Sequence, residues 1–199
     1  MRGQRTRPST LIGTWFGIGL QDTVIGAFES IATARVGATS QTTILLENIP
    51  QKYKHLQLRM FGRSTGAYTY SSFYIRPNGD SGLNYTFHAL TGDGASASAS
   101  GRGTGSDTVW SAQNITGNNA ATNNYGVVIV DILDYTNTNK HKVMRSFGGY
   151  DNNGSGTPIG TANNNSSVWL STAAITYLNL YTDGDFMQYS HVALYGIEG

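Results

Sequence analysis

The chain has 199 residues, no cysteine, and 13 Lys and Arg against 12 Asp and Glu, for a net charge of +1. This length suits one domain that buries a core of its own. The near-neutral charge argues against nucleic acid as a partner, because general binders neutralise phosphates with clustered Lys and Arg. The lack of cysteine excludes a disulfide framework, a thiolate nucleophile and a cysteine zinc site.

The first 27 residues differ in character from the rest of the chain. Arg2, Arg5 and Arg7 precede an apolar run of about ten residues, an order loosely like that of a secretory signal. Three glycines and two threonines dilute the run, and no clean cleavage site follows, so a retained arm is favoured. The run is too short to span a bilayer, so no membrane partner is expected. We expect residues 1–27 to form an arm and residues 28–199 a single β-sandwich domain.

From residue 28 onward the sequence shows short alternating runs separated by turn clusters, with no amphipathic helical pattern of ten residues or more. This pattern predicts an all-β domain. It predicts eleven strands, at 28–36, 42–49, 55–63, 70–76, 84–90, 108–115, 125–135, 141–149, 167–171, 174–182 and 188–197. We therefore expect an antiparallel two-sheet sandwich of jelly-roll type.

Turn-forming residues divide these strands. Asn78-Gly79 lies between two predicted strands and is a strong hairpin signal, since both residues tolerate the positive φ of a type I′ turn. Residues 137–139 and 183–185 are predicted to reverse the chain in a similar way. The polar, small-residue stretches 92–106 and 151–167 are predicted to be exposed loops.

The run 127–133, VVIVDIL, is apolar almost throughout. Strands covered on both faces have this composition. We expect one face to lie against the second sheet and the other against a loop or another subunit. Asp131 and Asp134 stand at the end of the run, and turn and edge chemistry is favoured there over a functional carboxylate pair.

The residues suggest no catalytic site, metal site or cofactor. The histidines lack metal-ligand spacing and are more simply hydrogen-bonded strand residues; they are His55, His88, His141 and His191. The stretch 151–156 begins like a calcium loop, but Ala162 stands where the bidentate glutamate should be, which favours a plain turn.

Two nonapeptides, at 54–62 and 140–148, share the pattern K-H-x-x-x-R-x-F-G. If both are strands, alternation places one set of side chains on each face. One face then carries His55, Gln57, Arg59 and Phe61 in the first copy, and His141, Val143, Arg145 and Phe147 in the second. The opposite face is apolar in the first copy (Leu56, Leu58, Met60) but not in the second (Lys142, Met144, Ser146), so unequal burial is predicted. Arg59 and Arg145 are expected to be inter-strand or inter-subunit hydrogen-bond donors.

Segments 28–59, 75–94, 127–156 and 188–199, taken in order, resemble short structural proteins and terminal modules of tailed bacteriophages, especially those of cyanobacteria and marine bacteria. The resemblance implies a β-sandwich virion component that is commonly trimeric and has no enzymatic activity. The module makes up almost the whole chain, which suits a capsid decoration or cement protein better than a long tail fibre.

The expected function is thus that of a trimeric cement protein, not an enzyme, which bridges capsomers in the virion. The arm is expected to dock on the major capsid protein or another virion protein, or else to pack within its own trimer. Its docking residues would be Arg2, Arg5, Arg7, Leu11, Ile12, Trp15, Phe16, Ile18 and Leu20. One alternative is a receptor-binding tail or head fibre protein that recognises host glycans through tyrosines and long polar loops. A secreted carbohydrate-active enzyme is another.

Overall fold

The computed structural model describes residues 28–152 and 159–199, and within them it contains twelve strands and no helix. All strand pairings are antiparallel. The strands are β1 (Phe28–Arg35), β2 (Gln41–Leu46), β3 (His55–Gly62), β4 (Tyr70–Pro77), β5 (Tyr85–Gly92), β6 (Ala97–Asp107), β7 (Trp110–Thr116), β8 (Gly126–Leu133), β9 (Lys142–Asp151), β10 (Gly160–Trp169), β11 (Leu178–Phe186) and β12 (His191–Ile197).

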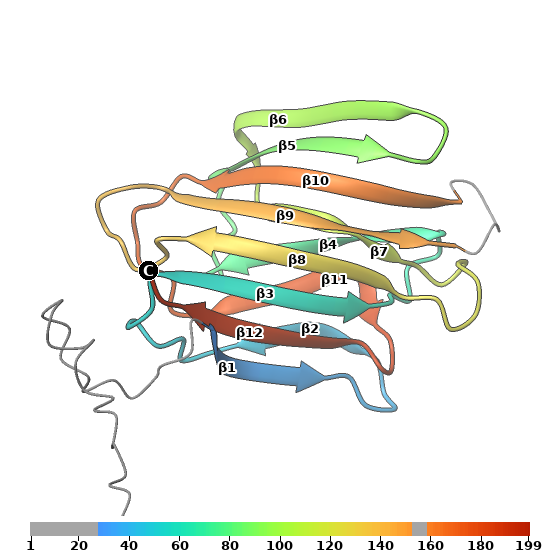
Figure 1. Ribbon diagram of the computed structural model, residues 1–199, viewed down its shortest axis with the longest axis horizontal. Helices are drawn as coiled ribbons and strands as arrows, with labels where there is room; N and C mark the ends of the chain where they lie inside the picture. Colours follow the sequence, from blue (N-terminus) through green and yellow to red (C-terminus); the bar gives the residue numbers. More distant parts are fainter. Residues whose placement is uncertain (1–27, 153–158) are drawn as a thin grey trace, which may run out of the picture.

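The strands form two sheets that lie one in front of the other (Figure 1). The front sheet has eight strands in the order β1-β12-β3-β8-β9-β10-β5-β6, and the rear sheet has four in the order β2-β11-β4-β7. The prediction of an all-β antiparallel two-sheet sandwich is confirmed. Its jelly-roll type stays a prediction.

The core lies between the sheets because alternate residues of each strand point inward. Leu56, Leu58 and Met60 of β3 and Val128, Val130 and Ile132 of β8 are essentially inaccessible to solvent, as are Phe73 and Ile75 of β4 and Leu178 and Leu180 of β11. Each such side chain contributes about 1.5–3 kcal/mol when it leaves water. The alternation that predicted these strands is therefore the alternation that builds the core.

Two strands occupy stretches that the sequence predicted to be loops. β6 covers most of 92–106, and β10 begins at Gly160 inside 151–167. Both contain small or polar residues that carry little β signal. β6 is an edge strand that pairs only with β5, whereas β10 pairs with β9 on one side and β5 on the other. Backbone pairing with neighbours, which propensity does not measure, makes these segments strands.

Polar groups of β9 and β10 that face inward are buried with hydrogen-bond partners from the rear sheet. The Asn165 amide donates to the carbonyl of Ala112 on β7 at 3.0 Å, and Gln113 of β7 donates to the carbonyl of Ser146 on β9 at 3.1 Å. The Ser146 hydroxyl also donates to Ala112. A buried polar group costs little when it is hydrogen-bonded. This polar layer explains why β10 lacks the apolar alternation of the other strands.

The turn at Asn78-Gly79 forms, but not as a hairpin between paired strands. Both residues have positive φ, 50° and 66°, and the Asp80 amide donates to the Pro77 carbonyl at 3.0 Å. The hairpin prediction is wrong because β4 belongs to the rear sheet and β5 to the front sheet. The turn thus carries the chain from one layer to the other.

The other two turn predictions have different outcomes. Residues 137–139 lie in the connection between the paired strands β8 and β9, and the Asn137 amide donates to the Asp134 carbonyl at 3.0 Å. Residues 183–185 do not reverse the chain. They lie inside β11, where the register with β2 shifts between Tyr181 and Phe186.

The two nonapeptides are buried more alike than their sequences predicted. On the inward face of β9, Lys142, Met144 and Ser146 are all buried, Lys142 completely. The Lys142 ammonium donates to the carbonyls of Asn137 at 2.5 Å and of Lys140 and Thr172 at 3.0 Å. Burial, and then the positive charge of Lys140, lowers the pKa of Lys142 below its usual value. The prediction of unequal burial is wrong because backbone carbonyls take the place of apolar neighbours.

We expect Lys142→Met to lower the free energy of unfolding by about 2 kcal/mol, because it leaves three carbonyls without their shared donor. Chemical denaturation monitored by tryptophan fluorescence measures this change. Lys140→Met is the matched control: that side chain is 54% exposed in its ion pair with Asp134, so a loss of at most about 0.5 kcal/mol is expected. Equal losses in the two variants would contradict the structural role of Lys142.

Candidate interaction surface

The outward face of the front sheet brings together residues of β3, β8 and β9, with β8 in the middle. The pairing register sets Gln57, Asp131 and Arg145 side by side in one row across these strands. The adjacent outward-facing row, two residues further along each strand, contains Arg59, Ile129 and Phe147. The two nonapeptides therefore flank a common strand and are offset by two residues, so the two arginines lie in adjacent rows.

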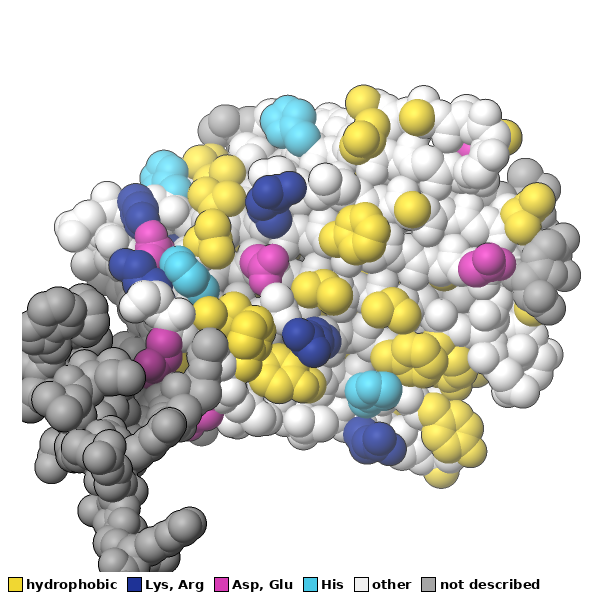
Figure 2. Space-filling view, viewed as in Figure 1, with side chains coloured by type: hydrophobic (Ala, Val, Ile, Leu, Met, Phe, Trp, Pro, Cys, Tyr) yellow, Lys and Arg dark blue, Asp and Glu magenta, His cyan; other side chains and the backbone are white. Residues whose placement is uncertain are grey.

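Apolar side chains are spread over this surface, with polar and charged side chains between them (Figure 2). Seven of them, which we call the exposed stripe, are at least one-third accessible: Phe61 (36%), Leu90 (57%), Val127 (50%), Ile129 (37%), Leu133 (43%), Val143 (39%) and Phe147 (63%). Soluble monomers rarely expose large contiguous apolar patches. The outer face of β8, which the sequence predicted to be covered by a loop or a subunit, is covered by no element of the described chain.

A polar row crosses the exposed stripe. The Gln57 amide donates to the Asp131 carboxylate at 2.8 Å, and Arg59 Nε donates to the Gln57 carbonyl oxygen at 2.9 Å. Within residues 28–152 and 159–199, no ion pair joins Asp131 to Arg59 or Arg145. The surface therefore presents one carboxylate and two guanidinium groups whose charges are not paired with each other inside the chain.

Arg59 and Arg145 have different surroundings. The Arg59 guanidinium lies 5.3 Å from the ring centre of Tyr195 on β12 and 5.8 Å from that of Phe28 on β1. Exposed cation–π contacts contribute about 0.5–1 kcal/mol each. Arg145 is exposed on β9, beside Asp131 and Ser166 of the neighbouring strands. Both arginines are exposed on the outward face. Arg59 is held there by aromatic rings of its own sheet, whereas Arg145 has no such ring contact.

The remaining charged and imidazole groups are dispersed. His55 Nδ1 accepts a hydrogen bond from the Asp134 amide at 3.0 Å, and the His191 ring lies 5.4 Å from Phe61. His88 and His141 are exposed. Asp134, at a φ of 48°, forms ion pairs with Lys54 and Lys140 at the end of β8. In the part of the chain that the structure describes, no three His, Cys, Asp or Glu residues gather as a metal site would require.

A shallow hollow lies on the same outward face, between β9, β10 and β5. His88, Ser166 and Arg145 stand in one row across the three strands, with Asn164 and Leu90 beside them. Its volume is about 500 Å³. The imidazole, the hydroxyl and the guanidinium can all donate hydrogen bonds. The hollow therefore combines donors suited to an anionic or hydroxyl-rich ligand with an apolar rim.

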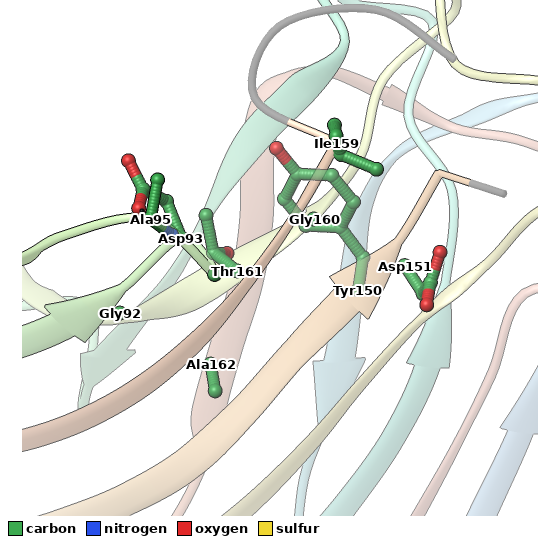
Figure 3. A pocket seen from close by; sticks show the side chains of 10 residues that line it. Gly92, Asp93, Ala95, Tyr150, Asp151, Ile159, Gly160, Thr161 and Ala162 are labelled. Carbon is green, nitrogen blue, oxygen red and sulfur yellow. Dashed lines mark hydrogen bonds between the residues drawn. The ribbon is translucent and has the colours of Figure 1, made fainter. Parts of the chain in front are cut away.

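A second pocket lies at the end of the sandwich, between the β5–β6 turn and the ends of β9 and β10 (Figure 3). Its volume is about 440 Å³, and its walls include Asp93, Tyr150 and Thr161. Asp93 is already occupied, since it accepts hydrogen bonds from the Ala95 and Ser96 amides at 2.9 and 2.7 Å. Burial raises the pKa of the Tyr150 hydroxyl to about 12, so this group stays protonated at neutral pH.

The sequence located the exposed stripe in part. It placed Phe61 and Phe147 with the arginines and identified the doubly apolar run of β8, but it did not include Leu90. Leu90 joins the stripe only because β10, of which the sequence predicted only the last residues as strand, connects β9 to β5. The predicted docking residues of the arm, from Arg2 to Leu20, lie outside the described residues, as does most of the calcium-like stretch 151–156.

Searches with protein-family models, among curated proteins and among solved structures each return no match. In the described parts of the chain, no helix has the length and apolar character needed to cross a membrane.

We expect Arg59→Ala to lower the melting temperature of the chain by a few degrees, because two ring contacts are lost within the sheet. Arg145→Ala should leave the melting temperature unchanged in dilute solution, because the Arg145 guanidinium makes no hydrogen bond, ion pair or ring contact with the described residues. Differential scanning calorimetry of both variants measures this. The assignment of Arg59 to a structural role fails if the two arginines prove interchangeable.

Proposed function

We propose that this chain is a non-enzymatic structural protein of a phage virion, a homotrimeric decoration or cement protein that stabilises the head by bridging capsomers. The observation that carries the proposal is the exposed stripe: a broad apolar sheet face suits a protein that works by burying surface against other proteins. The resemblance of four segments to phage structural modules supports the same function.

The physical basis of such bridging is multivalency. A trimer that attaches at one point raises the effective concentration of its remaining attachment points near the neighbouring capsomers. Each contact can then be modest while the assembly remains firmly bound. In this proposal residues 1–27 dock on the major capsid protein, with Arg2, Arg5 and Arg7 pairing with acidic residues and the apolar run supplying anchors.

Cryo-electron microscopy of the phage particle that carries this protein tests the proposal. The expected result is threefold density on the outer surface of the head, at positions where capsomers meet. Density for the chain only on the tail or its fibres would contradict the capsid assignment, and absence of the chain from purified particles would contradict the virion assignment as a whole.

A second candidate function is recognition of host glycans by a head or tail fibre. The hollow formed by His88, Ser166 and Arg145 favours it, because hydrogen-bond donors beside the apolar Leu90 are a combination that binds sugars. Here the surface would hold a saccharide that carries carboxylate or sulfate groups, since Arg145 is cationic.

A glycan array probed with the purified full-length chain separates this candidate from the first. If the hollow binds acidic glycans, we expect Arg145→Ala to reduce binding at least about tenfold. Arg76→Ala is the control, because Arg76 lies on the rear sheet and packs against Tyr181 at 5.0 Å. No binding by the unmodified chain would exclude this candidate for the glycans tested.

A further inference from the structure

We propose that the outward face of the front sheet, centred on β8, is the surface through which copies of this chain associate with each other. This inference goes beyond the proposed function, because a face that packs on the same face of a second copy makes a twofold contact, which is separate from the contacts that would hold a trimer. It concerns the exposed stripe and the polar row that crosses it, all on residues that the structure describes.

The size of the surface is sufficient for a specific interface. From β3 to β5 the outward face spans five neighbouring strands, of which β3, β8, β9 and β5 carry residues of the exposed stripe, and β3 itself is eight residues long. Four strand spacings of about 4.8 Å and eight residues of about 3.3 Å give a footprint of roughly 500 Å² per copy. Two copies together then bury roughly 1,000 Å², which is the lower bound for a specific protein–protein interface. The adjoining outward residues of β12 and β1 can enlarge this area.

The apolar residues of the surface are of the kind found in a domain core, and the row of Gln57, Asp131 and Arg145 crosses them. Val127, Ile129, Leu133 and Val143 are aliphatic strand residues like those on the inward face of the same strands. Sheets pack face to face about 10 Å apart when both faces are of this kind. The outward face of β8 is therefore suited to a second sheet as its occupant, and the described chain has no further sheet to supply.

The charges on the surface are complementary to those of another copy. Asp131 stands between Gln57 and Arg145, with Arg59 in the next row, and neither arginine pairs with it inside the chain. A second copy brings both signs of charge to the contact, so its arginines can pair with Asp131 and its Asp131 with an arginine.

Sedimentation velocity of the full-length chain over a wide range of concentration tests the proposal. The unmodified chain should be oligomeric. Phe147→Glu and Ile129→Glu should each raise the dissociation constant about 100-fold or more, because each places a carboxylate in an apolar contact. Both side chains are exposed in the single chain, so circular dichroism should show an unchanged fold. Phe147, at 63% exposure, is the safer of the two positions.

Leu45→Glu is the matched control. Leu45 is an apolar strand residue of similar exposure, 46%, but it lies on β2 of the rear sheet, so this variant should associate like the unmodified chain. If the unmodified chain is monomeric, the proposal is overturned, and the exposed stripe would instead be covered by residues 1–27 or by another protein. Undiminished association of Phe147→Glu, or dissociation caused by Leu45→Glu, would also overturn it by placing the interface elsewhere.

Sedimentation velocity and microscopy of the particle test separate claims, so either claim can be contradicted while the other stands. A chain that associates through the exposed stripe but is missing from the head retains the interface and loses the cement function. A chain that is present on the head but associates through another face retains the function and loses this interface.

Discussion

The antiparallel pairing of β8 with β3 on one side and β9 on the other is the constraint on which the rest of this structure depends. This register decides which side chains of the three strands meet the rear sheet and which meet the exterior. A shift of one residue in β8 would exchange Val128, Val130 and Ile132 for Val127, Ile129 and Leu133. Since both sets are apolar, β8 supplies one face to the core and leaves a largely apolar face, interrupted by Asp131, on the exterior.

Side-chain alternation predicted much of this arrangement from sequence, because β3, β8 and β12 have apolar inward residues that match the period of a strand. It could not predict β10, whose inward Asn165 is held by a β7 carbonyl, or Lys142, whose ammonium is held by three carbonyls. The partner of Asn165 lies 53 residues away in sequence, and Lys142 combines the nearby carbonyls of Asn137 and Lys140 with that of Thr172, 30 residues away. A local hydrophobic pattern contains no information about such hydrogen bonds, so the burial of these polar residues was not predicted.

The candidate surface, too, could be predicted from the sequence only in part. The apolar composition of β8 indicated that something covers both of its faces, and the shared nonapeptide placed Arg59 and Arg145 outward. Only the strand order could show that these elements adjoin, and that Leu90 extends the stripe through β10 and β5. The strand order also separates two arginines that look equivalent in sequence: Arg59 packs on the rings of Phe28 and Tyr195, while Arg145 points to the exterior.

Hydroxyl-radical footprinting of the full-length chain, read by mass spectrometry at low and high protein concentration, tests most directly whether the outward face of β8 is covered in the assembled protein. Phe147 and Tyr189 are comparably exposed in the single chain, at 63% and 69%. The account predicts that oxidation of Phe147 falls sharply as the protein assembles, while oxidation of Tyr189 does not change. Equal oxidation of Phe147 at both concentrations, in a sample shown to be oligomeric, would contradict it.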